Sequence, residues 1–151
     1  MKLAEALAER SDCQKRIEDL KTRIMKSARV QEGEQPAEDP ATLLVELDRL
    51  CNRLLDLIRS INRTNAAVRF DPQRTISDAI AERDVVAKKR ELFAHIAEAA
   101  TTRQDRYSKS EVKFIATVGV AELQKRKDQL AKEYRELDTR LQELNWNTDT
   151  I

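Results

Sequence analysis

Apolar side chains recur every three or four residues along four long stretches of this sequence. That spacing places them on one face of an α-helix, and 151 residues include only 2 Gly and 3 Pro to interrupt it. Three of these breakers lie in QEGEQPAEDP, residues 31–40, where a helix cannot continue. The pattern therefore predicts an all-α protein with helices at about residues 2–30, 40–65, 75–101 and 119–145.

The apolar stripes of these helices differ in width. The first is a narrow seam, whereas the second is broad enough to predict contacts with at least two neighbours. Its members are Leu43, Leu44, Leu47, Leu50, Cys51, Leu54, Leu57, Ile58 and Ile61. The expected core residues of the third helix are Ile76, Ala79, Ile80, Val86, Leu92, Phe93 and Ile96. We expect a single domain over residues 1–151, folded as an antiparallel four-helix bundle or as paired long helical hairpins.

Local signals mark the helix ends. Asp39 can cap a helix that begins at Pro40, and Thr75 followed by Asp78 resembles a capping box. Residues 103–114, RQDRYSKSEVKF, follow no helical pattern and form an irregular segment before the last helix. Tyr107, Val112 and Phe114 alternate with polar residues there, which is compatible with a short β-hairpin.

Cys13 and Cys51 both fall in apolar stripes, where cysteine usually behaves as a small buried hydrophobe. A hairpin folded about residues 35–36 would place residue 13 opposite residue 58. Cys51 would then lie roughly 10 Å away along the axis, at about 1.5 Å per residue. Since a disulfide needs Cα atoms within about 7 Å, we predict two free thiols.

The charge balance argues against a general attraction to nucleic acid or to an anionic membrane. Lys and Arg number 28 against 27 acids, a net charge of +1. The sequence contains no run of eighteen apolar residues, and Glu5 and Glu9 interrupt any signal-peptide core. We expect a cytoplasmic protein without membrane contact, for which nucleic-acid binding is disfavoured.

The usual catalytic and cofactor motifs are missing from the sequence. The one histidine, His95, lies four residues after Glu91 in a predicted helix and lacks the second pair that a di-iron site requires. Two isolated glycines cannot form a phosphate-binding loop. We therefore expect no cofactor and no metal, and a role outside catalysis is favoured, although a carboxylate pair among the 27 acids stays open.

The segment 103–114 is the best functional candidate, because basic side chains and aromatics alternate in it. Two interpretations are open: an ion-pair network with Arg29, Glu32 and Glu34 that serves packing or subunit contact, or a ligand site. Its net charge of +2 is slight for nucleic-acid binding. The candidate binding residues are Arg29, Glu32, Arg103, Gln104, Arg106, Tyr107 and Lys113.

A second candidate cluster joins INRTN, residues 61–65, with ELNWN, residues 143–147. Both are expected at the end of the protein that holds the chain termini. The asparagines can serve in turns and helix caps, and the tryptophan side chain can cover the end of the core. The alternative is a binding site made of Asn62, Arg63, Asn65, Asn145 and Trp146.

Four stretches resemble one small family of uncharacterised bacterial proteins, some of which are labelled septicolysin. They are ARVQEGE (28–34), INRTN (61–65), RQDRYSKSEVKF (103–114) and YRELDTRLQELNW (134–146). The resemblance covers nearly the whole chain and implies a helical protein of unknown function, with no catalytic or binding residue to carry over. The label implies a pore-forming toxin, whereas the sequence offers no export signal and no long alternating stretch for a membrane β-hairpin.

Our leading hypothesis is a structural or protein-interaction module that self-associates, because the apolar face of the second helix is wider than one neighbour can cover. The alternative is a small-molecule-binding protein or enzyme with its site around residues 103–114. Weak nucleic-acid binding ranks third, and pore formation ranks last.

Overall fold

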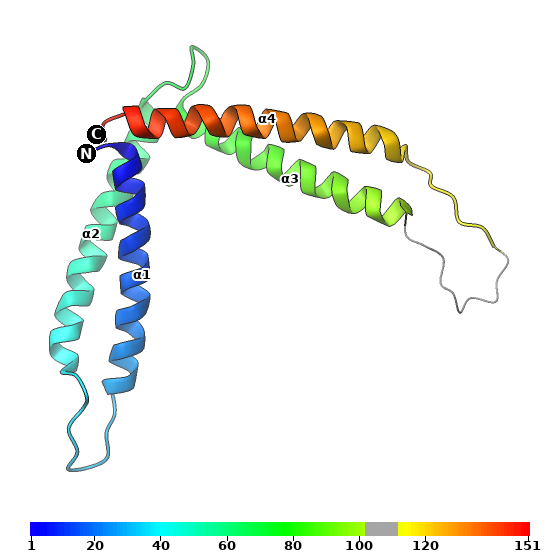
Figure 1. Ribbon diagram of the computed structural model, residues 1–151. Helices are drawn as coiled ribbons and strands as arrows, with labels where there is room; N and C mark the ends of the chain where they lie inside the picture. The colour runs from blue at the N-terminus through cyan, green and yellow to red at the C-terminus, as the bar shows by residue number, and fades with distance from the viewer. Residues whose placement is uncertain (102–111) are drawn as a thin grey trace. The chain divides into compact units, whose positions relative to one another are not determined.

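The computed structural model describes residues 1–101 and 112–151, which form four long α-helices (Figure 1). They are α1 (Leu3–Ser27), α2 (Pro40–Ala67), α3 (Ile76–Thr101) and α4 (Val120–Asn147). The all-α class is confirmed. Residues 112–119 form no strand, and the rest of the proposed β-hairpin, including Tyr107, lies outside the described residues.

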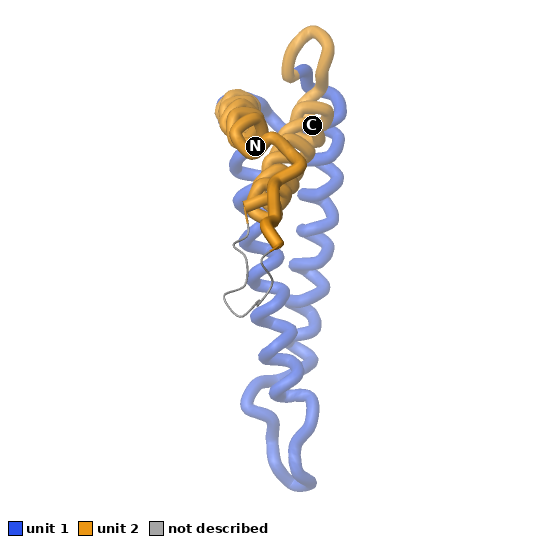
Figure 2. Tube along the Cα trace, turned by 90° about the vertical axis from the view of Figure 1, so that its right-hand side faces the viewer, with its two compact units in different colours: residues 1–69, 142–151 blue, residues 70–141 orange. Residues whose placement is uncertain are grey.

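The chain divides into two compact units, which Figure 2 shows in different colours. Unit 1 contains residues 1–69 and 142–151, and unit 2 contains residues 70–141. Each unit is built around one helical hairpin, α1 with α2 in unit 1 and α3 with α4 in unit 2. The paired long hairpins expected from the sequence are therefore present, while the assignment of one domain stays a prediction.

The hairpin of unit 1 is held by a seam in which every seventh residue is buried. On α1 these residues are Ala6, Cys13, Leu20 and Ser27, and on α2 they are Leu43, Leu50, Leu57 and Thr64. A seven-residue repeat keeps the same face of each helix toward its partner, as in a coiled coil. One narrow face per helix is therefore enough to hold the pair together.

Ion pairs beside this seam fix the antiparallel register. Glu9 accepts two hydrogen bonds from Arg53, at 2.6 and 2.7 Å, and Arg16 reaches Glu46 at 3.2 Å. The residue numbers of the partners on α2 therefore decrease as those on α1 increase, so the two helices are antiparallel. Residue 16 beside residue 46 is incompatible with a hairpin folded about residues 35–36, so that expectation was wrong. The connection 28–39 is not a symmetric turn, since α1 ends at Ser27 rather than near residue 30 and Gly33 adopts a φ of 88°.

The last residues of the chain lie against the ends of α1 and α2. The Leu3 and Thr150 amides donate to the carbonyls of Thr148 and Met1, both at 2.9 Å. The Ile151 amide donates to the buried hydroxyl of Thr64 at 2.9 Å. Thr64 belongs to INRTN, so this stretch does lie beside both termini, as expected.

The hairpin of unit 2 has a smaller buried centre. Val86 of α3 packs with Leu130 and Leu137 of α4, and Phe70, Phe93 and Tyr134 cover them partly. Arg83 of α3 donates to Asp138 of α4 at 2.9 Å. The predicted cap of α3 is confirmed, since the Thr75 and Asp78 side chains each accept the backbone amide of the other residue.

Several residues of α2 and α3 that we expected in the core are exposed to solvent. Leu44, with an exposed fraction of 48%, and Cys51 are exposed on α2, and Leu92 and Ile96 are 47% and 44% exposed on α3. Both thiols are free, as predicted. The reason is not the expected separation along the helix axis. Cys13 lies in the buried seam, whereas Cys51 points away from it. Apolar spacing identified these faces correctly but could not say that they stay uncovered in one chain.

The seam can be tested by truncating one of its layers. Leu50 is 1% exposed, so Leu50→Ala should lower the free energy of unfolding by about 2–5 kcal/mol through lost contacts and a residual cavity. Val45→Ala, at a position 71% exposed on α2, should change it by only about 0.5 kcal/mol. Urea unfolding followed by circular dichroism measures both, and equal effects of the two substitutions would contradict the assigned seam.

Candidate functional site

The primary candidate residues fall only partly within the described structure. Arg29 lies in the α1–α2 connection and lines an open hollow of about 490 Å³ with Val30, Gln31 and Glu34. Glu32 is exposed in the same connection and does not line this hollow. Neither Arg29 nor Glu32 has an ion pair within the described ranges.

The rest of that set belongs to the segment before α4. Arg103, Gln104, Arg106 and Tyr107 lie outside the described residues, and Lys113 is exposed in irregular backbone. The choice between an internal ion-pair network and a ligand site at this segment therefore stays open.

The second candidate cluster differs from its expected role in two ways. INRTN does not cap α2, since the helix continues to Ala67 and the Val68 amide, rather than an asparagine, closes its end on the Thr64 carbonyl. Trp146 is 65% exposed, so it does not cover the end of the core. Arg63 donates to the Arg59 carbonyl of its own helix, and the Oδ1 atom of Asn65 is buried without a hydrogen-bond partner among the described residues.

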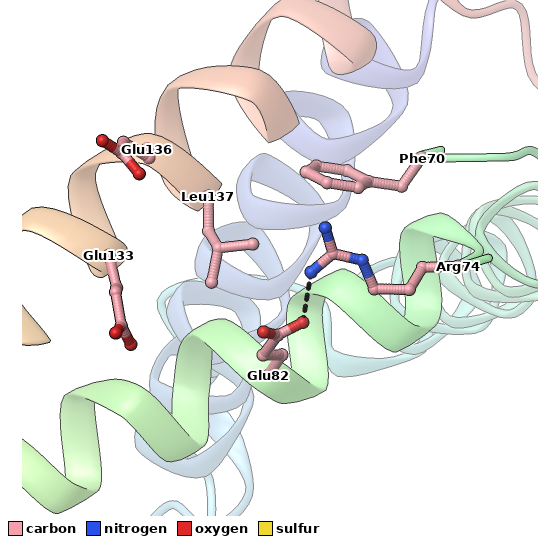
Figure 3. Close-up of a pocket in the computed structure, with 6 residues that line it drawn as sticks. All are labelled: Phe70, Arg74, Glu82, Glu133, Glu136 and Leu137. Carbon is pink, nitrogen blue, oxygen red and sulfur yellow. Dashed lines mark hydrogen bonds and ion pairs between the residues drawn. The ribbon is translucent and has the colours of Figure 1, made fainter. Parts of the chain in front are cut away.

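A hollow that the sequence did not suggest lies between α3 and α4 in unit 2. It measures about 310 Å³ and is lined by Phe70, Arg74, Glu82, Glu133, Glu136 and Leu137. Figure 3 shows the Arg74 guanidinium directed at Glu82, close to the ring of Phe70, while Glu133 and Glu136 project from α4. Arg74 lies 4.8 Å from the centre of that ring, which suits a cation–π contact.

Arg74 is already neutralised, so this hollow is acidic. Its guanidinium donates to Asp71 Oδ2 at 2.6 and 2.9 Å and also binds Glu82. Hydrogen bonding to Arg74, assisted by the backbone amides of Gln73 and Arg74, holds the pKa of Asp71 below its usual value. Glu136 has only a long ion pair with Lys132, at 3.9 Å, and Glu133 has no ion pair among the described residues. Across the described part of the chain, no group of three or more His, Cys, Asp or Glu side chains is arranged to hold a metal.

A second hollow adjoins the first along the same helix pair, and Glu133 lines both. It measures about 220 Å³, with Lys89, Phe93, Arg126, Gln129 and Leu130 as its other lining residues. The Phe93 ring lies 4.4 Å from the Arg126 guanidinium and 5.8 Å from the Lys89 ammonium. Neither cation has a carboxylate partner among the described residues.

Two unpaired cations beside one aromatic ring can hold a small anion, and the Gln129 amide can add a hydrogen bond. The sequence held one local signal for this arrangement, since Lys89 and Phe93 are four residues apart on a helix. Arg126 comes from the antiparallel helix, so its approach depends on the pairing of α3 with α4.

Comparison with known proteins places this chain in a family. Residues 10–150 match the model of the family of unknown function DUF6847. The chain belongs to DUF6847. The resemblance to a family of helical proteins of unknown function is thus confirmed at that level.

One solved structure supports the fold of this DUF6847 protein over its full length. A functionally unknown conserved protein from Corynebacterium diphtheriae is 48% identical, with a TM-score of 0.94, and the match covers 100% of this chain and 99% of the other. No curated protein matches the chain. Neither finding carries the name septicolysin. Among the described residues of the DUF6847 chain, no helix has the length and apolar character needed to cross a membrane.

The Asp71–Arg74 pair gives a pH prediction. Replacing Arg74 by Gln should raise the pKa of Asp71 toward its ordinary value of about 3.9, because the largest stabilising hydrogen bond is lost. A carboxyl with a lowered folded pKa stabilises the fold above its unfolded pKa and loses that contribution as the pH falls through the folded value. The stability gap between the wild type and Arg74→Gln should therefore be largest near pH 7 and shrink below about pH 4.

Carbon-detected NMR titration of Asp71, with urea unfolding at pH 7 and pH 3, measures both effects. Arg135→Gln is the matched control, since Arg135 is exposed on α4 and makes no ion pair with the described residues. An Asp71 pKa that does not move in Arg74→Gln would show that the pair is not formed in solution.

Proposed function

We propose that this DUF6847 protein is a cytoplasmic structural module that self-associates and performs no catalysis itself. The observation that carries the proposal is an apolar stripe on α2 that no other described part of the chain covers. The stripe consists of Leu44, Cys51, Leu55 and Ile58, and the first three of these are exposed.

This stripe is additional to the seam that α2 already uses. Leu43, Leu50 and Leu57 are buried against α1, so the hairpin is complete without Leu44 or Leu55, which are 48% and 45% exposed. Apolar surface of this kind at regular helical spacing is more typical of an interface than of isolated surface residues. A second copy of the chain is the simplest protein that is always present to cover it.

α3 repeats the pattern in unit 2. Val85, Leu92 and Ile96 are 65%, 47% and 44% exposed, and they recur at intervals of seven and four residues. α3 thus has one face for α4 and another that is apolar and uncovered by the described residues. Two such stripes in one chain support association of copies more strongly than either stripe alone.

The proposal predicts that the purified protein is an oligomer and that Leu44→Glu disrupts it. A glutamate there would have to be buried without a partner, so the association constant should fall by about tenfold or more. Analytical ultracentrifugation and native mass spectrometry at micromolar concentration measure the mass against 17.4 kDa for one chain.

Met25→Glu is the control for that experiment. Met25 is 67% exposed on α1, so the substitution adds the same charge at an exposed apolar position outside the stripe. Association should be unchanged in this variant. A wild-type protein that is monomeric at micromolar concentration would overturn the proposal.

A second candidate function rests on the hollow at Phe93. We propose that Lys89 and Arg126 there bind a small anion with phosphate-like chemistry, with Gln129 as a further donor. Glu133 at the edge would suit a hydroxyl or ammonium group on the same ligand. Arg126→Gln should weaken binding of inorganic phosphate by about tenfold, because one charge-assisted contact is removed. Arg135→Gln should leave it unchanged.

Isothermal titration calorimetry, supported by NMR shifts of the Lys89 and Arg126 side chains, measures this binding. Phosphate binding that is absent in the wild type, or equally weakened by both variants, would dismiss the anion site.

Each of the remaining alternatives can be tested separately. A ligand site at Arg29 and residues 103–114 would be supported by an extra mass that leaves on denaturation. Weak nucleic-acid binding would require an affinity that falls steeply with salt. Pore formation, implied only by the septicolysin label, would require haemolysis by the purified protein.

A further inference from the structure

We infer that α2 of one copy packs in parallel on α3 of a second copy. This inference rests on the proposed self-association and names the surfaces that carry it. It follows from three properties of the uncovered stripes: their spacing, their exposure and their charge.

The two stripes have the same spacing. On α2 the exposed residues of the stripe are Leu44, Cys51 and Leu55, with Asp48 among them on the same face. On α3 the corresponding positions are Val85, Lys89, Leu92 and Ile96. Each follows intervals of four, three and four residues, which keeps its members on one face of the helix. Each therefore presents three apolar side chains and one charge, with the charge at the second position of both.

The two charges are opposite and lack ion-pair partners among the described residues. Asp48 is exposed on α2 and pairs with no basic group there. Lys89 is exposed on α3, and its one described contact is with the Phe93 ring at 5.8 Å. Several arginines near the two hairpin seams, in contrast, already bind carboxylates of the same chain. Asp48 and Lys89 are thus available for each other.

A parallel alignment of the two helices brings these properties together. It places Asp48 opposite Lys89 and Cys51 opposite Leu92, with apolar residues facing each other at both ends. An antiparallel alignment has the same spacing but places each charge opposite an apolar side chain, where desolvation would disfavour it. The parallel contact leaves both hairpin seams intact, since the buried residues of those seams belong to neither stripe.

Every chain carries both stripes, so each copy can offer α2 to the α3 helix of a neighbour and α3 to the α2 helix of a neighbour. The contact therefore joins two unlike faces of identical chains.

Charge reversal tests this contact on the full-length protein. Asp48→Lys and Lys89→Asp each place like charges opposite each other in the α2–α3 contact. Each should raise the dissociation constant for self-association by about tenfold or more. Both positions are exposed in the single chain, so the helical content of each variant should stay at the wild-type value.

The decisive step is to mix the two single variants. Where copies of the two variants meet, one kind of contact pairs the lysine introduced at position 48 with the aspartate introduced at position 89, and the other kind has the wild-type charges. The mixture should regain a dissociation constant within about threefold of wild type, as should the double variant Asp48→Lys/Lys89→Asp. Asp56→Lys and Arg90→Asp are matched reversals outside the stripes and should leave self-association unchanged.

Sedimentation equilibrium separates the possible results. A monomeric wild type would overturn the proposed function together with this inference. A wild-type assembly that persists in both single variants, or that the mixture fails to restore, would overturn the α2–α3 contact while leaving self-association in place.

Discussion

The buried seam with a seven-residue repeat is the constraint on which the rest of the structure depends. It holds α1 against α2 through one narrow face of each helix. A smaller buried cluster, made of Val86, Leu130 and Leu137, holds α3 against α4. Because one residue in seven supplies the centre of the contact, most of each helix surface is left for other purposes. The second apolar faces of α2 and α3 are therefore not needed to hold the hairpins together.

A repeating apolar seam does not by itself define which layers pair, because a shift by one repeat places apolar residues against each other again. The charges beside the seam remove this degeneracy. Glu9 with Arg53 and Arg16 with Glu46 pair in only one register, and Arg83 with Asp138 does so in unit 2. Each exposed pair contributes little to stability, about 0–1 kcal/mol, but a shifted register would separate all of them at once. Their role is therefore specificity of pairing more than strength.

The parts that sequence predicted well are those with local causes. Helix positions follow from apolar spacing and from breakers, and the Thr75–Asp78 cap from residues three apart. Coverage and register are not local. Apolar spacing shows that α2 has a wide face but not that Leu44 and Cys51 stay exposed, and the asymmetric connection 28–39 shifted the pairing of α1 with α2. The hollow at Phe93 was missed for the same reason, because Arg126 reaches it from another helix.

Lys89 links the two proposals for this protein. Its ammonium lies beside Phe93 in the hollow proposed to bind an anion, and it is also the charge of the α3 stripe proposed to face Asp48 of a second copy. One ammonium cannot fully neutralise both a bound phosphate and a carboxylate of the partner. Anion binding and self-association would therefore oppose each other, and by thermodynamic linkage each would weaken the other by the same factor.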